Sequence, residues 1–191
     1  SALERDMDAF EQALASIQGG RVLDVATGRG GFVHLLADGL RSYTYIVGVD
    51  LSTRMMADAV QQSRHRHTHF VQMDARQLGF GDESFDTVSI SSSLHHLENI
   101  PQCVGEMKRV LKSGGHLIIR ETHRDIQAEP QLTDMYIHHW VAEIDSALGY
   151  THNRTFTRQE LVDLVEGLGL CNVVFYDISN TDLDPMDEAA I

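Results

Sequence analysis

Short apolar runs alternate along the chain with stretches in which apolar residues recur every three or four positions. The runs are brief and rich in β-favouring side chains, which is typical of buried strands. They lie at residues 21–26, 45–49, 69–72, 85–91 and 116–120. The stretches between them have the spacing of helices that bury one stripe. This alternation predicts an α/β fold in which a mostly parallel sheet has helices on both faces.

Capping residues indicate where several helices begin. Ser52 and Asn99 each precede a helical stretch, and Pro101 lies in the first turn of the second one, where a missing N–H costs little. Gly114 is expected to end that helix. Residues 157–160 have the pattern of a capping box, which predicts a further helix.

The rhythm of strands and helices changes after Arg120. A polar stretch is followed by helical spacing over residues 132–148, and the apolar run at 170–178 predicts a sixth strand. The tail at 179–191 is polar and acidic. No repeat or linker divides the chain, so we expect a single domain over residues 1–191.

Composition and charge narrow the classes of function. The formal net charge of −13 repels phosphate backbones, which argues against a nucleic-acid partner. No stretch approaches the roughly 20 continuous apolar residues of a membrane span. Cys103 and Cys171 lie in apolar segments and are expected to be free core thiols, which favours a reducing, cytoplasmic setting. Because the first residue is Ser1 and not Met, we expect the N-terminus to be trimmed.

A glycine-rich turn follows the first predicted strand. Gly28 and Gly30 let the backbone approach a ligand closely, and the helix after them offers free N–H groups. Asp50 ends the second strand about twenty residues beyond Gly30, where an acid binds the ribose hydroxyls of an adenosine-type cofactor. NAD is a competing ligand, and it is disfavoured because Val33 occupies the third glycine position of its fingerprint.

The motifs resemble those of class I S-adenosylmethionine (SAM)-dependent methyltransferases. Residues 24–30, Asp-Val-Ala-Thr-Gly-Arg-Gly, resemble motif I of that family. Residues 47–52 resemble its acidic second-strand motif, and residues 73–75 resemble its third-strand motif. Residues 85–97 resemble the fourth strand of the small-molecule branch, and residues 110–119 resemble the turn before the fifth strand. The five motifs occur in the order that the family has.

This resemblance implies a three-layer, Rossmann-like methyltransferase fold and SAM as the cofactor. The cofactor-binding residues that it implies are Asp24, Ala26, Gly28, Gly30, Asp50, Leu51, Met73, Asp74, Ala75, Ser91 and Ser92. Asp24, Gly28 and Gly30 would line the methionine portion, and Asp50 would bind the ribose hydroxyls. Leu51 and Asp74 would contact adenine, and the two serines would sit under the sulfonium. Ala26 stands where the family often has glycine.

The reaction implied is methyl transfer to a small soluble metabolite. The protein must bring a nucleophile to the methyl carbon, and a base is needed only if that nucleophile loses a proton. Candidate bases after the fourth and fifth strands are His95, His96, Glu121 and His123. His138 and His139 lie on the helix at 132–148, and His139 is expected to be packed near the apolar stripe of that helix.

Two further patterns limit the reaction. No Asp/Asn-Pro-Pro-Tyr/Phe sequence follows the fourth strand, which argues against methylation of nucleobase or glutamine amino groups. The alternating His65, His67 and His69 could suggest a metal site. They precede the third strand, at the edge opposite the cofactor, so we expect a solvated basic loop and no bound metal.

The resemblance divides the expected domain into three parts. Residues 1–120 form the cofactor-binding core, residues 121–156 form a substrate or lid insertion, and residues 157–191 hold the last helix, strand and tail. No seventh strand of the family type is recognised after Ile178, so truncation stays open. The alternative function is a non-catalytic SAM-binding regulator or partner protein. The acceptor, the methylated atom and the oligomeric state cannot be read from the sequence.

Overall fold

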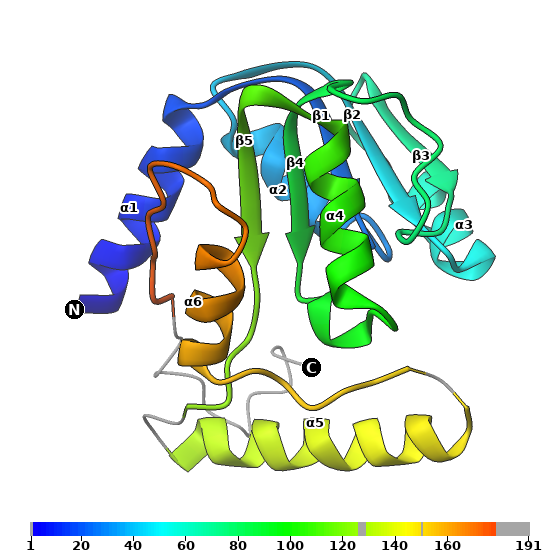
Figure 1. Cartoon of the computed structure of the whole chain (residues 1–191), viewed down its shortest axis with the longest axis vertical. Coiled ribbons are helices and arrows are strands. Elements are labelled where there is room, and N and C mark those ends of the chain that lie inside the picture. The colour runs from blue at the N-terminus through cyan, green and yellow to red at the C-terminus, as the bar shows by residue number, and fades with distance from the viewer. Residues whose placement is uncertain (1, 126–128, 150, 179–191) are drawn as a thin grey trace. The chain divides into compact units, whose positions relative to one another are not determined.

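The computed structural model describes residues 2–125, 129–149 and 151–178 (Figure 1). The chain divides into two compact units. One is Glu11–Glu121, and the other is Ser1–Phe10 together with Thr122–Ile191.

A five-stranded sheet forms the centre of the unit Glu11–Glu121, and each pair of neighbouring strands is parallel. The strands are β1 (Gln18–Val25), β2 (Ser42–Asp50), β3 (Thr68–Gln72), β4 (Phe85–Ser91) and β5 (Leu111–Arg120). Their spatial order is β3-β2-β1-β4-β5, so the direction of winding reverses between β1 and β4. Open α/β sheets bind ligands at the carboxyl ends of the strands near such a reversal.

Helices pack on both faces of this sheet. They are α2 (Gly31–Gly39), α3 (Thr53–Gln62) and α4 (Ile100–Val110). The unit also contains the short 3-10 helix η1 (Leu94–His96), and α1 (Ala2–Ser16) spans the boundary between the two units. Figure 1 shows α4 in front of the sheet and α2 behind it. The predicted three-layer, Rossmann-like α/β fold with a mostly parallel sheet is therefore confirmed.

The central strands are buried on both faces, which explains their continuous apolar runs. Val22, Leu23 and Val25 of β1 are fully buried, as are Val88 and Ile90 of β4. These two strands hold the residues at their carboxyl ends in fixed positions because their backbones are paired on both sides.

Three predicted helix starts are confirmed by their capping hydrogen bonds. The Ser52 hydroxyl accepts from the backbone N–H of Met55 at 3.3 Å. The Asn99 side chain accepts from the backbone N–H of Gln102 at 3.2 Å. Thr157 forms the predicted capping box at the start of α6 (Arg158–Glu166).

The second unit contains α5 (Glu129–Ala147) and α6. The helix predicted at residues 132–148 is confirmed, but its apolar stripe is largely exposed. Exposed apolar side chains on or just after it are Tyr136, Ile137, Trp140, Val141, Ile144 and Leu148. No helix within the described part of the chain is long and apolar enough to cross a membrane.

One predicted boundary in the first unit is wrong. The helix α4 ends at Val110 and not at Gly114. Leu111 already pairs with Phe85 of β4, so that β5 begins there and includes the glycine. Pairing with a neighbouring strand outweighs the local signal of a C-terminal glycine.

The predicted sixth strand is also wrong. Residues 170–178 are all described, and none of them is in a strand. A strand requires a hydrogen-bonded neighbour, and Asn172 departs from extended backbone with a φ of 57°. Cys171 is consequently exposed, so the expected core thiol is found at Cys103 alone. The predicted acidic tail at 179–191, where a seventh strand was sought, lies outside the described residues.

Candidate active site

The loops after β1, β2, β3 and β4 lie at one edge of the sheet because parallel strands end on the same side. The residues expected to bind the cofactor are found in these loops or at the ends of these strands. The winding reverses between β1 and β4, so the loops after those two strands flank the position where such folds bind ligands.

Backbone conformation in the loop after β1 alternates between ordinary and left-handed. Ala26, Gly28 and Gly30 have φ values of 53°, 56° and 83°. Left-handed backbone is easy for glycine and strained for alanine. The departure from the family pattern at Ala26 therefore falls on a position where the backbone itself favours glycine.

The two glycines of this loop serve different purposes. A Cβ added to Gly30 would lie 2.9 Å from the ring of Phe70 in β3, so glycine is needed there for packing. A Cβ added to Gly28 would meet nothing within 4 Å in the described part of the chain. The space over Gly28 is therefore open.

Asp50 at the end of β2 connects two loops. Its Oδ2 accepts a hydrogen bond from the backbone N–H of Gly28 at 2.9 Å. Its Oδ1 accepts from the backbone N–H of Ser52, also at 2.9 Å. Each carboxylate oxygen has a second lone pair, so the group can still accept from two ligand hydroxyls. Leu51, which lies between Asp50 and Ser52 in the sequence, is 62% exposed.

Asp24 of β1 is a buried carboxyl group, with 1% of its surface exposed. Its Oδ1 accepts a hydrogen bond of 2.7 Å from the hydroxyl of Ser89 in β4. Its Oδ2 has no hydrogen-bond partner among the described residues. Burial raises the pKa of Asp24 from 3.8 to about 6, against a smaller lowering by the neighbouring hydroxyls of Thr27 and Ser89. An unsatisfied buried oxygen at a ligand-binding edge fits a cationic or hydrogen-donating ligand.

The loop after β3 begins with a bond between Met73 N–H and the carbonyl of Asp50 at 2.9 Å. Asp74 accepts hydrogen bonds from the backbone and the guanidinium of Arg76, at 2.8 Å in both cases. These bonds lower the pKa of Asp74. Arg76 also pairs with Glu98. Ala75 lies between Asp74 and Arg76 and is half-buried.

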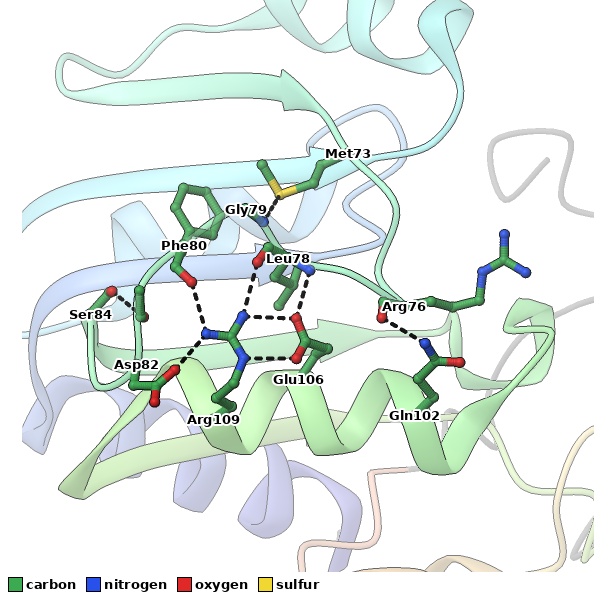
Figure 2. Close-up of polar contacts among 11 residues, drawn as sticks. Met73, Arg76, Leu78, Gly79, Phe80, Asp82, Ser84, Gln102, Glu106 and Arg109 are labelled. Atoms are coloured by element: carbon green, nitrogen blue, oxygen red, sulfur yellow. Dashed lines mark hydrogen bonds and ion pairs between the residues drawn. The ribbon is translucent and has the colours of Figure 1, made fainter.

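Arg109 of α4 fixes the remainder of this loop, as Figure 2 shows. Its guanidinium donates to the carbonyls of Leu78 and Phe80 at 2.9 and 2.8 Å. It also pairs with Glu106 at 2.7 Å and with Asp82 at 2.8 Å. Glu106 in turn accepts from the Leu78 N–H at 2.8 Å. The loop that contains Asp74 is therefore bound to a helix at several points.

The loop after β4 is tied to both of its neighbours. The Ser93 hydroxyl donates to the carbonyl of Ala26 at 3.1 Å. The Ser92 N–H donates to the carbonyl of Arg120 at 2.7 Å, and Arg120 donates to the Ser91 hydroxyl at 3.4 Å. The serines expected near the sulfonium therefore lie between the ends of β1 and β5.

His95 and Glu121, predicted as separate candidate bases, form one buried pair. His95 Nδ1 lies 3.1 Å from Glu121 Oε1. The other oxygen of Glu121 accepts from the backbone N–H of Leu94 at 2.8 Å. The exposed fractions of the two side chains are 4% and 1%. A carboxylate in this position fixes the ring orientation and tautomer of a histidine.

The other histidine candidates have different surroundings. His96 is exposed, and its ring centroid lies 4.2 Å from that of His95. His123, His138 and His139 belong to the second unit. His139 is half-buried and its Nε2 lies 3.2 Å from the hydroxyl of Thr155. Burial lowers the pKa of His139.

The expected solvated histidine loop is only partly solvated. His67 and His69 are exposed. His65 has a side chain that is 19% exposed, and it lies 3.5 Å from Asp38 of α2. Its ring also contacts His34, with 5.3 Å between ring centroids. The prediction is thus wrong for His65, because the loop packs against α2.

Several residues that support the edge were missed in the sequence. Ser89 lies between Val88 and Ile90 in β4, and a serine between two apolar residues was the available signal. Glu106 and Arg109 have the spacing of a helical ion pair, but their bonds to the loop after β3 depend on the tertiary fold.

Known proteins resemble this chain over most of its length. Residues 23–119 match the family described as a methyltransferase domain. A demethylmenaquinone methyltransferase of Porphyromonas gingivalis is 31% identical over 83% of this chain and 71% of that protein. A 2-phytyl-1,4-naphthoquinone methyltransferase of Nostoc punctiforme is 26% identical over 87% of this chain and 78% of that protein. The solved structure of a putative methyltransferase from Bacillus halodurans has a TM-score of 0.64 and 28% identity, over 84% of this chain and 67% of that one.

The strand order, together with the glycine-rich loop and Asp50 at the carboxyl ends of the strands, defines a Rossmann-like protein of the class I methyltransferase type. The chain belongs to the methyltransferase domain family that its residues 23–119 match. It is an enzyme that transfers a methyl group to a small-molecule acceptor, and its family implies the use of SAM.

Proposed function

We propose that SAM binds at the carboxyl edge of the sheet, in contact with the loops after β1, β2, β3 and β4. The observation that carries this proposal is the carboxylate of Asp50, which accepts backbone N–H groups from Gly28 and Ser52 at 2.9 Å each. The residues present fit the cofactor. The unpartnered Oδ2 of Asp24 would accept from its amino group, and the open space over Gly28 would admit the methionine portion.

The remaining contacts follow from position. The second lone pairs of the Asp50 oxygens would accept from the ribose hydroxyls. Leu51, which is 62% exposed, would lose water when an adenine ring covers it. Asp74 would accept from the adenine amino group while Arg76 holds the carboxylate in place. Met73 and Ala75 would pack beside the ring, and Ser91 and Ser92 would line the methyl end. Ala26 and Gly30 would shape the loop.

We propose a reduced naphthoquinone ring as the acceptor class to be tested first. Two relatives that match most of the chain are named as methyltransferases of demethylmenaquinone and of 2-phytyl-1,4-naphthoquinone. A ring hydroxyl of such an acceptor loses a proton readily, which makes the ring a better nucleophile. SAM supplies an activated methyl group for in-line displacement.

In this proposal His95 is the proton acceptor. Its Nδ1–H faces Glu121, so the lone pair for a proton lies on Nε2. Glu121 is a positioning residue, because it contacts the base and the Leu94 backbone. The proton of the acceptor hydroxyl would pass to Nε2 as the methyl group is transferred. His96 and His123 stay as alternative bases, with His123 in the second unit.

We also propose that residues 1–191 act as one methyltransferase domain in which residues 121–156 select the acceptor. This region interrupts the strand–helix alternation and contains an open surface pocket of about 280 Å³. The net charge of −13 supports a partner other than nucleic acid.

Calorimetric titration of the whole chain with SAM, S-adenosylhomocysteine and NAD tests the cofactor proposal. Binding of the first two in the micromolar range and none of NAD is the expected result. A folded protein that binds neither SAM compound overturns it. Production of S-adenosylhomocysteine with reduced demethylated naphthoquinones then tests the acceptor. If the enzyme methylates other hydroxyarenes but not reduced demethylated naphthoquinones, the proposed acceptor class is rejected and the cofactor proposal stands.

A further inference from the structure

Two histidines and an aspartate form a chain within the second unit. His138 and Asp145 lie on α5, two turns apart and hence on the same face. His152 lies in the segment that returns along this helix. Its Nδ1 is 2.7 Å from Asp145 Oδ2, and its Nε2 is 3.2 Å from His138 Nε2.

The returning segment is fixed to α5 by further contacts. The Ser146 hydroxyl donates to the carbonyl of His152 at 3.3 Å. Thr155 is buried and lies 3.2 Å from His139 Nε2. Arg154 pairs with Glu143. His152 itself is only 8% exposed, so its ring is held in place before any ligand arrives.

The tautomer of His152 follows from the carboxylate beside it. Asp145 accepts only, so the Nδ1 of His152 must carry a hydrogen. The Nε2 of a neutral His152 then presents its lone pair toward His138 Nε2. A carboxylate bound to one ring nitrogen of a histidine fixes the ring and leaves the other nitrogen as the ligand atom, which is the arrangement that supports metal-ligating histidines.

The distance between the two Nε2 atoms suits a shared cation. Imidazole nitrogens bind Zn²⁺ at about 2.0–2.1 Å, which places two tetrahedral ligands roughly 3.3 Å apart. The observed separation is 3.2 Å. His152 also lines the open surface pocket of about 280 Å³, together with His139, Glu143, Ser146 and Arg154. This open pocket gives solvent molecules access to His152, and such molecules can complete the coordination of a bound ion.

We propose that His138 and His152 are two ligands of a divalent transition-metal site selective for Zn²⁺-like ions, with Asp145 as the supporting carboxylate. Imidazole favours borderline ions such as Zn²⁺ and Co²⁺ over Mg²⁺ and Ca²⁺. Each Nε2 atom binds a metal ion through its lone pair and therefore without a proton. The sequence predicted no metal, since the two histidines are separated by 13 residues and share no local motif.

The test is metal binding by the whole chain after treatment with a chelator. Titration with zinc chloride should give about one ion per chain. Co²⁺ should give visible d–d absorption, and Mg²⁺ should not compete. His138→Gln is the sharpest variant, because its amide can still donate a hydrogen bond to His152 Nε2 while it is a poor zinc ligand. His138→Gln and His152→Ala should each weaken zinc binding at least about 100-fold. Asp145→Asn should weaken it about 10–100-fold.

Two variants serve as controls. His65→Ala and His67→Ala each alter the other histidine-rich segment, and both should bind zinc as the unaltered protein does. Zinc should also raise the melting temperature of the unaltered protein and not that of His138→Gln. The proposal is overturned if no stoichiometric zinc binds, if His138→Gln binds zinc normally, or if His65→Ala alone abolishes binding. None of these readouts depends on methyl transfer.

Discussion

The backbone N–H of Gly28 donates a hydrogen bond of 2.9 Å to the carboxylate of Asp50. The same carboxylate accepts from the N–H of Ser52 through its other oxygen. A single side chain therefore sets the spacing between the loops after β1 and β2. In the proposed complex this group also receives the ribose hydroxyls, so cofactor affinity and loop geometry depend on one residue.

Asp50→Asn is expected to weaken SAM binding about 10- to 100-fold, since a hydrogen bond to a charged group contributes about 1.5–3 kcal/mol. Asparagine keeps one acceptor oxygen, so it can hold Gly28 or Ser52 but not both. Asp50→Ala should bind more weakly still. Calorimetric titration measures both variants.

Asp38→Asn is the matched control for Asp50. Asp38 lies on α2 and pairs with Arg64 at 3.3 Å, away from the loops proposed to bind SAM. Its SAM affinity should equal that of the unaltered protein. Normal affinity in Asp50→Ala would contradict the ribose-binding role.

Ala26→Gly is expected to stabilise the protein. Ala26 has a φ of 53°, and left-handed backbone costs a non-glycine residue about 1–2 kcal/mol. Glycine removes this strain but loses about 0.5–1 kcal/mol through the entropy of the unfolded chain. A net gain of up to about 1 kcal/mol corresponds to a rise in melting temperature of roughly 2–4 °C. Ala26→Val should lower the melting temperature, and a fall with glycine would show that no strain is stored there.

Local signals made much of the fold predictable. The caps at Ser52, Asn99 and Thr157 involve bonds within four residues, so the sequence contains all the partners. The buried strands β1 and β4 were recognised because burial on both faces requires an unbroken apolar run. The order of motifs likewise indicated which strand ends carry Asp24 and Asp50.

Errors arose where a distant partner decides the structure. The run at 170–178 has strand composition, but a strand forms only with a neighbour, and composition does not supply one. The start of β5 depends on pairing between Leu111 and Phe85. The bond between His95 and Glu121 joins residues 26 positions apart, so the sequence showed two candidates and not their coupling.

Arg109→Lys is expected to destabilise the protein, because lysine cannot replace a guanidinium that binds several acceptors. The loss frees the carbonyls of Leu78 and Phe80 and leaves Glu106 partly unpaired (Figure 2). SAM binding should weaken as well, since this loop contains Asp74. Urea denaturation and calorimetry measure the two effects.

Arg66→Lys, a change at an exposed arginine, is the control for Arg109→Lys and should alter neither quantity. If Arg109→Lys keeps full stability, the bonds drawn in Figure 2 contribute little to the fold.

The buried Asp24 predicts a dependence of stability on pH. Burial raises its pKa from 3.8 to about 6, so the folded protein holds a proton there more tightly than the unfolded chain does. The stability from this group is complete below about pH 4 and is lost as the pH rises through about 6. Asp24→Asn should lack this loss between those pH values in urea denaturation. If the free energy of unfolding changes with pH equally in Asp24→Asn and in the unaltered protein, Asp24 is not the group responsible.

Ionised Asp24 should favour SAM, because its unpartnered Oδ2 would face a cationic amino group. SAM affinity is therefore expected to fall as the pH drops below about 6, by up to about tenfold per pH unit. Asp24→Asn should bind SAM weakly at every pH and without this dependence. If SAM affinity depends on pH in Asp24→Asn as it does in the unaltered protein, another group causes the dependence.

Replacement of His95 separates binding from chemistry. His95→Gln is expected to lower kcat by about 10²–10⁴, the usual contribution of a general base, while the Kd for SAM stays unchanged. Glu121→Gln should lower kcat less and shift the pH–rate profile, because glutamine can present an N–H to His95 Nδ1 and favour the wrong tautomer. Melting temperatures of both variants are needed, since the pair is buried. If His95→Gln turns over normally, His95 is not the base, and His96 and His123 are the remaining histidine candidates. His123→Gln then decides between them. Normal turnover by His123→Gln would favour His96 as the base, and loss of turnover would favour His123.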